Sequence, residues 1–452
     1  MKSINPANGQ IIAEYAEHSS DEVFQIIGEV NQTFLNWREV PFQIRSEHMH
    51  RAAQVLRDKK EEYARLMSME MGKVIKESRA EIEKCAWVCD FYADHARSFL
   101  EDEYIESDAS RSFVSFEPLG TILAVMPWNF PFWQVFRFAA PGLMAGNSAV
   151  LKHASNVPGC ALAIEDVFRK AGFPDNLFRT LMIPAGQVEA VIRNPLIKAV
   201  TLTGSEPAGR NVASVAGSEI KKTVLELGGS DPFIVLDDAD IPACVVTASQ
   251  ARMINAGQSC IAAKRFIVVE SRLEEFETQQ TAIMQAMRVG DPLLEETQAG
   301  PLARMDLLEE LDAQVRQSVA LGAKLLTGGK RREGKGSFYL PTVLSKVKKG
   351  MPVYDQETFG PVSAIIPVKD EQEAIRVAND SDFGLGGSVW TRDTERGIRV
   401  ARQIESGAVF VNGMTKSDPR LPFGGVKRSG YGRELSSYGI KEFVNIKTIW
   451  VA

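Results

Sequence analysis

The feature that most constrains the fold is a repeated pattern of an apolar run, a Gly- or Pro-containing turn and a helical stretch, starting at residue 120. The apolar runs of this first series lie at 120–126, 148–152, 177–183, 199–203 and 223–227. Such alternation predicts a parallel sheet with helices on both faces, which is an α/β fold. Ligands bind these sheets beyond the carboxyl ends of the strands, where the turns lie.

A second series of strands follows and predicts a second domain. Its apolar runs lie at 233–236, 265–269 and 409–412, and Gly228-Gly229 is a plausible hinge between the two series. The length agrees with this division, because a chain of 452 residues exceeds what one hydrophobic core accommodates.

The remaining segments have a different character. Residues 20–100 carry apolar side chains at helical spacing and begin after the capping residue Ser19. Residues 104–119 alternate apolar and polar side chains, which predicts a β-ribbon, and 442–451 is a strand that can pair with this ribbon or with another chain. A ribbon alone is marginally stable and its edges favour partners, so we expect a homodimer or homotetramer.

The composition limits the classes of function. A net charge of -6, without a long Lys/Arg run, argues against nucleic-acid binding. The first residues lack the apolar core of a signal peptide, and no apolar run approaches the length of a membrane span. We therefore expect a cytoplasmic protein that binds neither nucleic acid nor a membrane.

The cysteines and histidines do not indicate a metal site. Five cysteines are an odd and sparse number, unlike a secreted disulfide scaffold. Cys85 and Cys89 share a helix face, so a metal pair is an alternative, but two small residues on a packed face are the favoured interpretation. His48 and His50 diverge on their helix, and no CxxC or HExxH spacing occurs. We expect no metal.

Three features could carry chemistry, and each also has an ordinary structural interpretation. Cys260 follows AsnAlaGlyGlnSer in a glycine-containing turn, an unexpected place for a residue that only packs. Glu226 ends an apolar strand, as either a functional carboxylate or a surface residue. Residues 203–209, ThrGlySerGluProAlaGly, place free N–H groups where a strand becomes a helix, which favours a phosphate. An ordinary strand–helix turn has the same appearance.

The combination of motifs is far more specific than any one of them. In order along the chain they are ProTrpAsnPhePro (127–131), Lys152, ThrGlySer (203–205), LeuGluLeuGlyGly (225–229), AsnAlaGlyGlnSerCys (255–260), GluThrPheGlyProVal (357–362) and ProPheGlyGlyValLysArgSerGlyTyrGlyArgGlu (422–434). Together they resemble the aldehyde dehydrogenase superfamily across essentially the whole chain. Within it, the sequence looks most like the shorter bacterial succinate-semialdehyde dehydrogenases.

The resemblance implies an aldehyde dehydrogenase-like fold with three parts. A Rossmann-type cofactor domain would comprise 1–103 and 120–228, and an α/β catalytic domain 229–430. A small β oligomerisation element would comprise 104–119 and 440–452.

The resemblance also implies an NAD(P)-dependent oxidation of an aldehyde. The Cys260 thiolate would attack the aldehyde carbonyl. The Asn129 side-chain amide and the Cys260 backbone N–H would stabilise the oxyanion that forms. Hydride transfer to the nicotinamide would leave a thioester on Cys260, and Glu226 would be the general base for its hydrolysis.

Cofactor residues carry over in the same way. Lys152 would bond the adenosine ribose, Ser205 a phosphate and Glu357 the ribose next to the nicotinamide. The other cofactor contacts that the resemblance implies are Trp128, Asn129, Gly204, Leu227 and Phe359. The family commonly has a Glu where Ser155 stands, and a Glu there would repel a 2′-phosphate. We therefore expect that both NADP and NAD are accepted.

The substrate is implied by fewer residues. Arg137 matches an arginine that contacts the substrate carboxylate in succinate-semialdehyde dehydrogenases, although it could instead lie on the outside of a helix. The second arginine of those enzymes is Ile254 here, and Ser417 or Arg420 are candidates to compensate. The remaining residues expected in the tunnel are Phe132 and Trp133. These apolar residues keep other small or medium-chain aldehydes open beside succinate semialdehyde.

Two other classes of function are alternatives to a dehydrogenase. Cys260, Glu226 and Lys152 are also the residue types of a cofactor-free thiol hydrolase, but the intact cofactor motifs argue against it. A structural or binding protein is the other alternative. Such a protein would have no reason to keep Cys260, Glu226 and Asn129 together.

Overall fold

A six-stranded sheet forms the first half of the molecule in the computed structural model, which describes all residues from Met1 to Ala452. The strand order is β19-β9-β8-β5-β6-β7. The strands are β5 (Thr121–Met126), β6 (Ser148–His153), β7 (Phe178–Thr180), β8 (Ile197–Thr203), β9 (Lys222–Glu226) and β19 (Gly430–Tyr431). All neighbours are parallel except β19, which returns from late in the chain and pairs antiparallel with β9. The predicted parallel sheet is confirmed.

Helices cover both faces of this sheet because alternate residues of its strands point to opposite sides. Ile122 and Ala124 of β5 pack on one side and Leu123 on the other. The first side is covered by α2 (Phe42–Asp58), α3 (Lys60–Met71), α4 (Ile75–Phe99), α5 (Trp133–Met144) and α6 (Pro158–Lys170). The second side is covered by α1 (Ser20–Trp37), α7 (Val188–Arg193) and α8 (Glu206–Ser218).

The four N-terminal helices confirm the helical pattern predicted for 20–100. The first helix, α1, begins with a capping box in which the Ser19 hydroxyl accepts from the Glu22 N–H and the Glu22 carboxylate accepts from the Ser19 N–H. Cys85 and Cys89 are fully buried on α4, as expected of small residues on a packed face. None of the helices combines the length and the apolar character needed to cross a bilayer.

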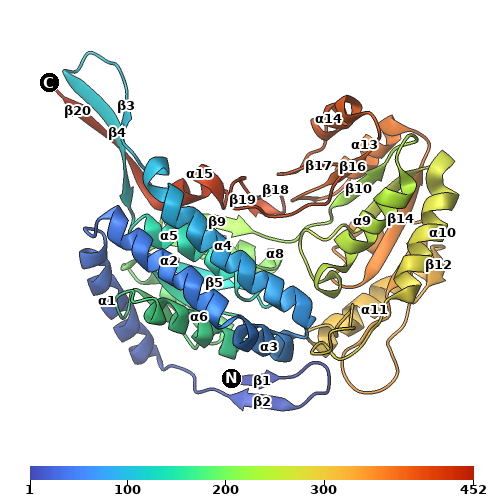
Figure 1. The fold of residues 1–452 in the computed structure, drawn as a ribbon, viewed down its shortest axis with the longest axis horizontal. Coiled ribbons are helices and arrows are strands. Elements are labelled where there is room, and N and C mark those ends of the chain that lie inside the picture. The colour runs from blue at the N-terminus through green and yellow to red at the C-terminus, as the bar shows by residue number, and fades with distance from the viewer.

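A seven-stranded sheet forms the second half, in the order β12-β13-β14-β11-β10-β16-β17. Its strands are β10 (Pro232–Val235), β11 (Arg265–Val269), β12 (Lys324–Thr327), β13 (Thr342–Ser345), β14 (Val362–Val368), β16 (Ser388–Trp390) and β17 (Phe410–Val411). All pairs are parallel except β12 with β13. The helices of this half are α9 (Ile241–Met253), α10 (Glu270–Ala286), α11 (Met305–Ala320), α12 (Pro352–Asp355), α13 (Glu371–Asn379) and α14 (Thr394–Ala401). Figure 1 shows the two halves side by side.

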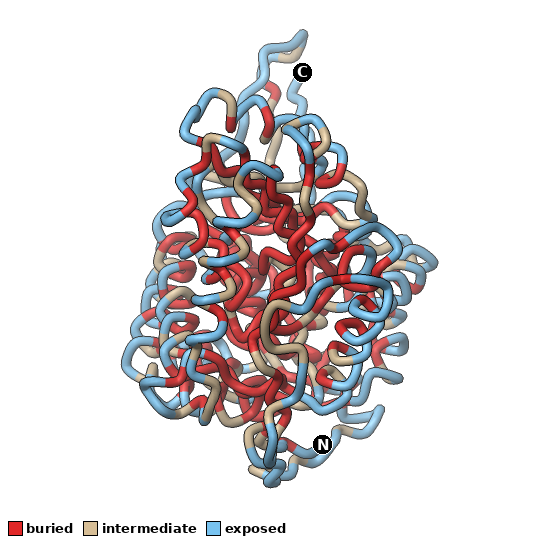
Figure 2. The backbone as a smooth tube through the Cα atoms, turned by 90° about the vertical axis from the view of Figure 1, so that its right-hand side faces the viewer, coloured by how far each residue is buried: buried red, intermediate tan, exposed pale blue.

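A three-stranded ribbon projects from the first half. It consists of β3 (Glu103–Tyr104), β4 (Arg111–Pro118) and β20 (Val444–Val451), in the order β20-β4-β3. The C-terminal segment is a strand, as predicted, and of the two partners left open for it the structure pairs β20 with β4 of the 104–119 ribbon. Figure 1 shows the ribbon and the C-terminus extending away from the body, and Figure 2 shows that this extension is largely exposed.

Short elements complete the chain. They are β1 (Lys2–Ile4) and β2 (Ile11–Glu14) near the N-terminus, the pair β15 (Phe383–Gly384) and β18 (Val426–Lys427), and α15 (Ser436–Ile440). Since β19 and α15 follow the second sheet in sequence but pack on the first half, the chain crosses between the halves more than once.

Candidate active site

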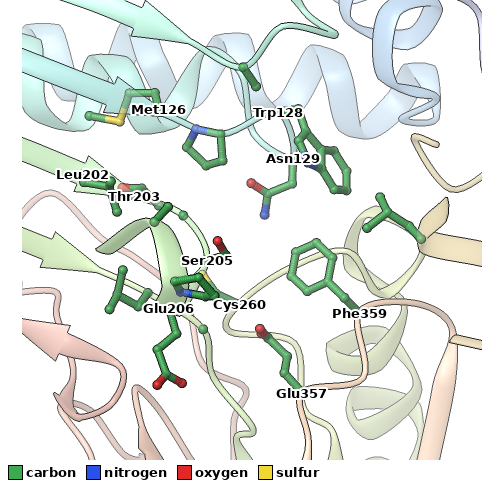
Figure 3. Close-up of a pocket in the computed structure, with 18 of the residues that line it drawn as sticks. Met126, Trp128, Asn129, Leu202, Thr203, Ser205, Glu206, Cys260, Glu357 and Phe359 are labelled. Atoms are coloured by element: carbon green, nitrogen blue, oxygen red, sulfur yellow. The ribbon is translucent and has the colours of Figure 1, made fainter. Parts of the chain in front are cut away.

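A cavity of about 600 Å³ lies where the carboxyl ends of β5, β6, β8 and β9 face the turns that lead into β11 and β14. This is the edge at which the parallel sheet was expected to bind a ligand. Eight of the nine predicted cofactor residues line it, namely Trp128, Asn129, Lys152, Gly204, Ser205, Leu227, Glu357 and Phe359. Figure 3 shows Trp128, Asn129, Ser205, Glu357 and Phe359 around the opening, with Cys260 among them.

One end of this cavity has the properties of an anion site. Lys152 is buried at the end of β6, and burial alone lowers its pKa, because no carboxylate compensates the charge. Ser205 is the N-cap of α8, and its hydroxyl makes no capping bond to that helix. A buried cation, a free hydroxyl and a helix N-terminus together fit the phosphate and ribose groups of a dinucleotide.

The middle of the cavity is shaped by aromatic side chains and by close backbone contacts. The rings of Trp128 and Phe359 meet edge to face, with centroids 5.8 Å apart. Glu357 accepts a hydrogen bond of 3.0 Å from the Gly229 N–H and pairs with Lys264 at 3.4 Å. A Cβ atom at Gly229 would lie 2.6 Å from the Cys260 carbonyl oxygen, so only glycine permits this approach.

Ser155 is the one predicted cofactor residue that does not line the cavity. Its side chain is exposed in the loop after β6, three residues beyond Lys152. The contact of Ser155 with a 2′-hydroxyl or 2′-phosphate therefore stays a prediction.

Cys260 is presented by an unusual turn between α9 and β11. Asn255 and Ala256 have φ of 51° and 52°, and Gly257 has φ of 78°, so three successive residues are left-handed. Such a conformation costs on the order of 1–2 kcal/mol for each non-glycine residue and needs support from its surroundings. Arg252 supplies support, because its buried guanidinium donates to the Gly257 carbonyl at 2.6 Å and to the Ala263 carbonyl at 3.0 Å.

The groups expected to form an oxyanion hole lie beside the thiol. Asn129 donates one amide proton to the Gln258 carbonyl at 3.1 Å, which ties it to the Cys260 turn and leaves its second amide proton available. The Cys260 backbone N–H makes no hydrogen bond within the chain. Figure 3 shows the Asn129 amide directed into the cavity. Two free donors therefore lie beside Cys260, as the predicted oxyanion hole requires.

The surroundings of the Cys260 thiol disfavour its ionisation. Cys260 is partly exposed to the cavity but shielded from bulk solvent, and burial raises its pKa to about 12. The positive charges of Arg137 and Lys264 counteract part of this rise. Attack by the thiolate requires further stabilisation of the negative charge or a base that removes the proton.

Glu226 lies in a different position from the one that a direct base would occupy. Its carboxylate is buried without a hydrogen-bond partner and lies against Gly424, and it lines neither this cavity nor the one described next. Burial raises its pKa to about 8, while the field of Arg137 opposes the rise. The general-base role of Glu226 therefore stays a prediction that needs its side chain to rotate toward Cys260.

A second cavity of about 320 Å³ opens on the opposite side of Cys260. Four of the five predicted substrate residues line it, namely Trp133, Arg137, Ile254 and Ser417. Cys260 belongs to the walls of both cavities, so the thiol stands where they meet.

Two expectations about this second cavity are wrong. Phe132 does not line it, because its side chain is fully buried in the core, 5.4 Å from the Tyr63 ring. Arg420 does not compensate for Ile254, because it pairs with Asp418 at 2.7 Å and its side chain is mostly exposed. Arg137 is buried within the site, so the alternative of an arginine on the outside of a helix is also wrong.

Sequence reasoning missed several residues that hold the site together. Lys264 is fully buried and donates to the carbonyls of Ser259 and Cys260, both at 2.9 Å. Lys84, on α4, reaches the second cavity from a helix far from any recognised motif. The LysArg pair at 264–265 could have indicated this role, because two cations at the start of an apolar strand need hydrogen-bond or charged partners. No comparable signal marked Lys84.

Comparison with known proteins assigns the whole chain to one group. Residues 1–449 match the model of the aldehyde dehydrogenase family. The chain belongs to the aldehyde dehydrogenase family. The resemblance inferred from the motifs is thereby confirmed.

Several relatives of this aldehyde dehydrogenase are similar over their full length. A Synechocystis sp. protein named "Probable succinate-semialdehyde dehydrogenase NADP(+)" is 54% identical over 452 residues, covering 100% of both chains. A Mycobacterium tuberculosis protein named succinate-semialdehyde dehydrogenase NADP(+) 1 is 49% identical over 455 residues, again covering 100% of both.

Solved structures confirm the fold of this family member. The crystal structure of a Streptococcus pyogenes succinic semialdehyde dehydrogenase in complex with NADP+ superimposes with a TM-score of 0.98 at 38% identity, covering 100% of this chain and 99% of that one. The predicted aldehyde dehydrogenase-like α/β fold is therefore correct.

Proposed function

We propose that this aldehyde dehydrogenase oxidises succinate semialdehyde to succinate with NADP+ or NAD+ as the acceptor. One observation carries the proposal: Cys260 lines both a dinucleotide-sized cavity with an anion site and a smaller cavity that the cationic side chains of Arg137 and Lys84 also line. An aldehyde that carries a carboxylate fits the second cavity. The relatives named after succinate semialdehyde support the same substrate.

The first step uses groups of the chain alone. Once the Cys260 thiol has passed its proton to solvent, the thiolate sulfur attacks the aldehyde carbon, and the carbonyl π electrons become the negative charge on the oxygen of the thiohemiacetal. The second amide proton of Asn129 and the Cys260 N–H then bind this oxygen. The nucleophile and both donors are held in one unit, because Asn129 is bonded to the turn that bears the thiol.

The residues around the larger cavity fit a nicotinamide dinucleotide. Lys152 and Ser205 would hold its ribose and phosphate end, and Glu357 with Phe359 the nicotinamide end. The bound cofactor supplies the acceptor for the hydride that the thiohemiacetal loses, which leaves a thioester on Cys260. We propose that both NADP+ and NAD+ are accepted, because Lys152 can bind a 2′-phosphate or a 2′-hydroxyl and Ser155 presents no carboxylate against either.

The last step is hydrolysis of the thioester. Glu226, rotated toward Cys260, would take a proton from the attacking water and release the acid.

The division into a cofactor domain (1–103, 120–228), a catalytic domain (229–430) and an oligomerisation element (104–119, 440–452) is part of the same proposal. The exposed apolar side chains of Tyr104, Ile446 and Trp450 on the ribbon support a homodimer or homotetramer. Five free cysteines support a reducing compartment such as the cytoplasm.

An aldehyde panel assayed with each cofactor tests the proposal. We expect kcat/KM for succinate semialdehyde to exceed that for butanal with both NADP+ and NAD+, measured by the absorbance of the reduced nicotinamide. Butanal as the better substrate would assign the enzyme to uncharged small or medium-chain aldehydes. Aldehyde or ester turnover without any reduced cofactor would instead indicate the thiol hydrolase.

Replacement of Asn129 tests the oxyanion hole. We expect Asn129→Ala to lower kcat roughly 10²–10³-fold, the loss typical of one oxyanion donor. KM should change little, because the donor acts on charge that develops during reaction. A kcat within a few-fold of the parent enzyme would remove Asn129 from the site of oxyanion stabilisation.

A further inference from the structure

Two cationic side chains in the second cavity, the buried Arg137 and the half-buried Lys84, differ in how their charge is compensated. Arg137 extends from α5 and Lys84 from α4, and both line the cavity beside Cys260. Of the two, only Arg137 was expected from the sequence. The difference between them decides which one is free to bind an anionic substrate.

Arg137 is already engaged with the protein. It forms a buried ion pair with Glu434, donates to the Thr203 hydroxyl at 3.2 Å, and lies 4.6 Å from the centre of the Phe423 ring. Most of its charge is therefore neutralised by a group of the chain. Arg137 therefore stabilises the strands and turns around the thiol, and it has little charge left to bind a substrate anion.

Lys84 has no such partner. It forms no ion pair, and its ammonium donates only to the Ser417 hydroxyl, at 2.7 Å, while lying 4.3 Å from the centre of the Trp133 ring. Glu81, on the same helix, is paired with Lys73 and accepts from the Phe132 and Trp133 N–H groups. Asp418, near Ser417, is paired with Arg420. Glu77, which also lines the cavity, accepts from the Asn255 N–H at 3.0 Å and forms no ion pair with Lys84.

An unpaired ammonium that is shielded from solvent is costly, and this cost applies to the half-buried Lys84. Burial, together with the positive charge of Arg137, lowers its pKa to about 8, and Cys85, Glu81 and Asp418 counteract this only in part. A shielded charge of this kind is stabilised when an anion enters the same cavity. The ring of Trp133 fixes the ammonium on one side without neutralising it.

We propose that Lys84, with the Ser417 hydroxyl, is the main contact for the carboxylate of the semialdehyde substrate. It thereby takes the place of the arginine that is missing at Ile254, from a different element of the fold. The inference rests on the proposed function, since it assigns the specificity of that same site. Arg137 then contributes a favourable field at longer range.

The test is Lys84→Met in the full-length enzyme, because methionine keeps the length and apolar stem without the charge. We expect KM for succinate semialdehyde to rise about 10- to 100-fold, the effect of losing a charge-assisted hydrogen bond in a buried site. KM and kcat for butanal should stay within about 2-fold. Lys84→Arg should recover much of the affinity for succinate semialdehyde, which a merely structural role would not require.

Lys76→Met is the matched control, because Lys76 lies exposed on the same helix outside both cavities and its replacement removes the same charge. It should leave both aldehydes unaffected. A rise in KM of less than about 3-fold in Lys84→Met, or equal rises for both aldehydes, would overturn the proposal. The proposed function fails separately, if the parent enzyme itself does not prefer succinate semialdehyde to butanal.

A measurement on the parent enzyme avoids any effect of substitution on folding. Because the Lys84 pKa is lowered to about 8, its ammonium is lost as the pH rises through that value. KM for succinate semialdehyde should therefore increase above about pH 8, whereas KM for butanal should not. Parallel profiles for the two aldehydes would count against Lys84, since titration of Cys260 or Glu226 affects both substrates alike.

Discussion

Cys260→Ala should abolish both the dehydrogenase and the esterase activity, with a loss of at least about 10⁴-fold in kcat. The physical reason is that no other thiol, hydroxyl or amine stands at the junction of the two cavities in position to form the covalent intermediate. The remaining cysteines are buried elsewhere in the fold. Initial rates with aldehyde and with an aryl ester measure the two activities.

Two controls separate loss of the nucleophile from loss of structure. Cys244→Ala removes a buried thiol from α9, far from the cavities, and should leave both activities within a few-fold of the parent. The Cys260→Ala protein should still bind NADP+, seen as quenching of tryptophan fluorescence, because Trp128 lines the cofactor cavity. If the Cys260→Ala protein still turned over aldehyde, the covalent mechanism would be wrong.

Glu226→Gln should separate the two halves of the reaction. The thioester should still form, so rapid mixing should show a first burst of reduced cofactor. The steady-state rate should then fall about 10²–10⁴-fold, the range expected for loss of a general base. Added hydroxylamine, which attacks thioesters without a base, should restore turnover in the variant. An unchanged steady-state rate would show that another group activates the water.

The pH profile sharpens this second expectation. The carboxyl group must be ionised to act as a base, and burial raises its pKa to about 8. Below that pH the group is mostly protonated, so the steady-state rate should climb as the pH rises and level off above it. The climb should be absent in Glu226→Gln. It should appear with butanal as well as with succinate semialdehyde, unlike the change in KM assigned to Lys84.

The backbone architecture could be predicted to a large extent from the sequence. The runs at 120–126 and 199–203 became β5 and β8 because strands buried on both faces are continuously apolar, and continuous apolar runs are easy to recognise. The C-terminal strand was predicted, but its partner was left open between the ribbon and another chain. The register between two strands that lie more than 300 residues apart in the sequence is determined by tertiary packing, and a local sequence pattern carries no information about it.

The site was predictable only where a motif carried the residue. Motifs located Cys260, Asn129, Lys152 and Glu357 because each lies at the end of a strand or in a turn next to one, close to where ligands bind. Phe132 was misplaced, since adjacent residues in the first turn of a helix point in different directions, and Trp133 rather than Phe132 faces the cavity. Lys84 lies on an amphipathic helix among other charged residues, and only the packing of α4 against α5 distinguishes it.

The pairing of β19 with β9 has a consequence for how the enzyme is made. Gly430 lies opposite Glu226 in this pairing, so the strand that ends at Glu226 lacks its outer neighbour until residue 431 has been synthesised. A ribosome-bound chain that already contains Cys260, Asn129 and Glu226 therefore still has an incomplete first sheet. Cys260 and Glu226 therefore come into their final register only when the polypeptide is nearly finished.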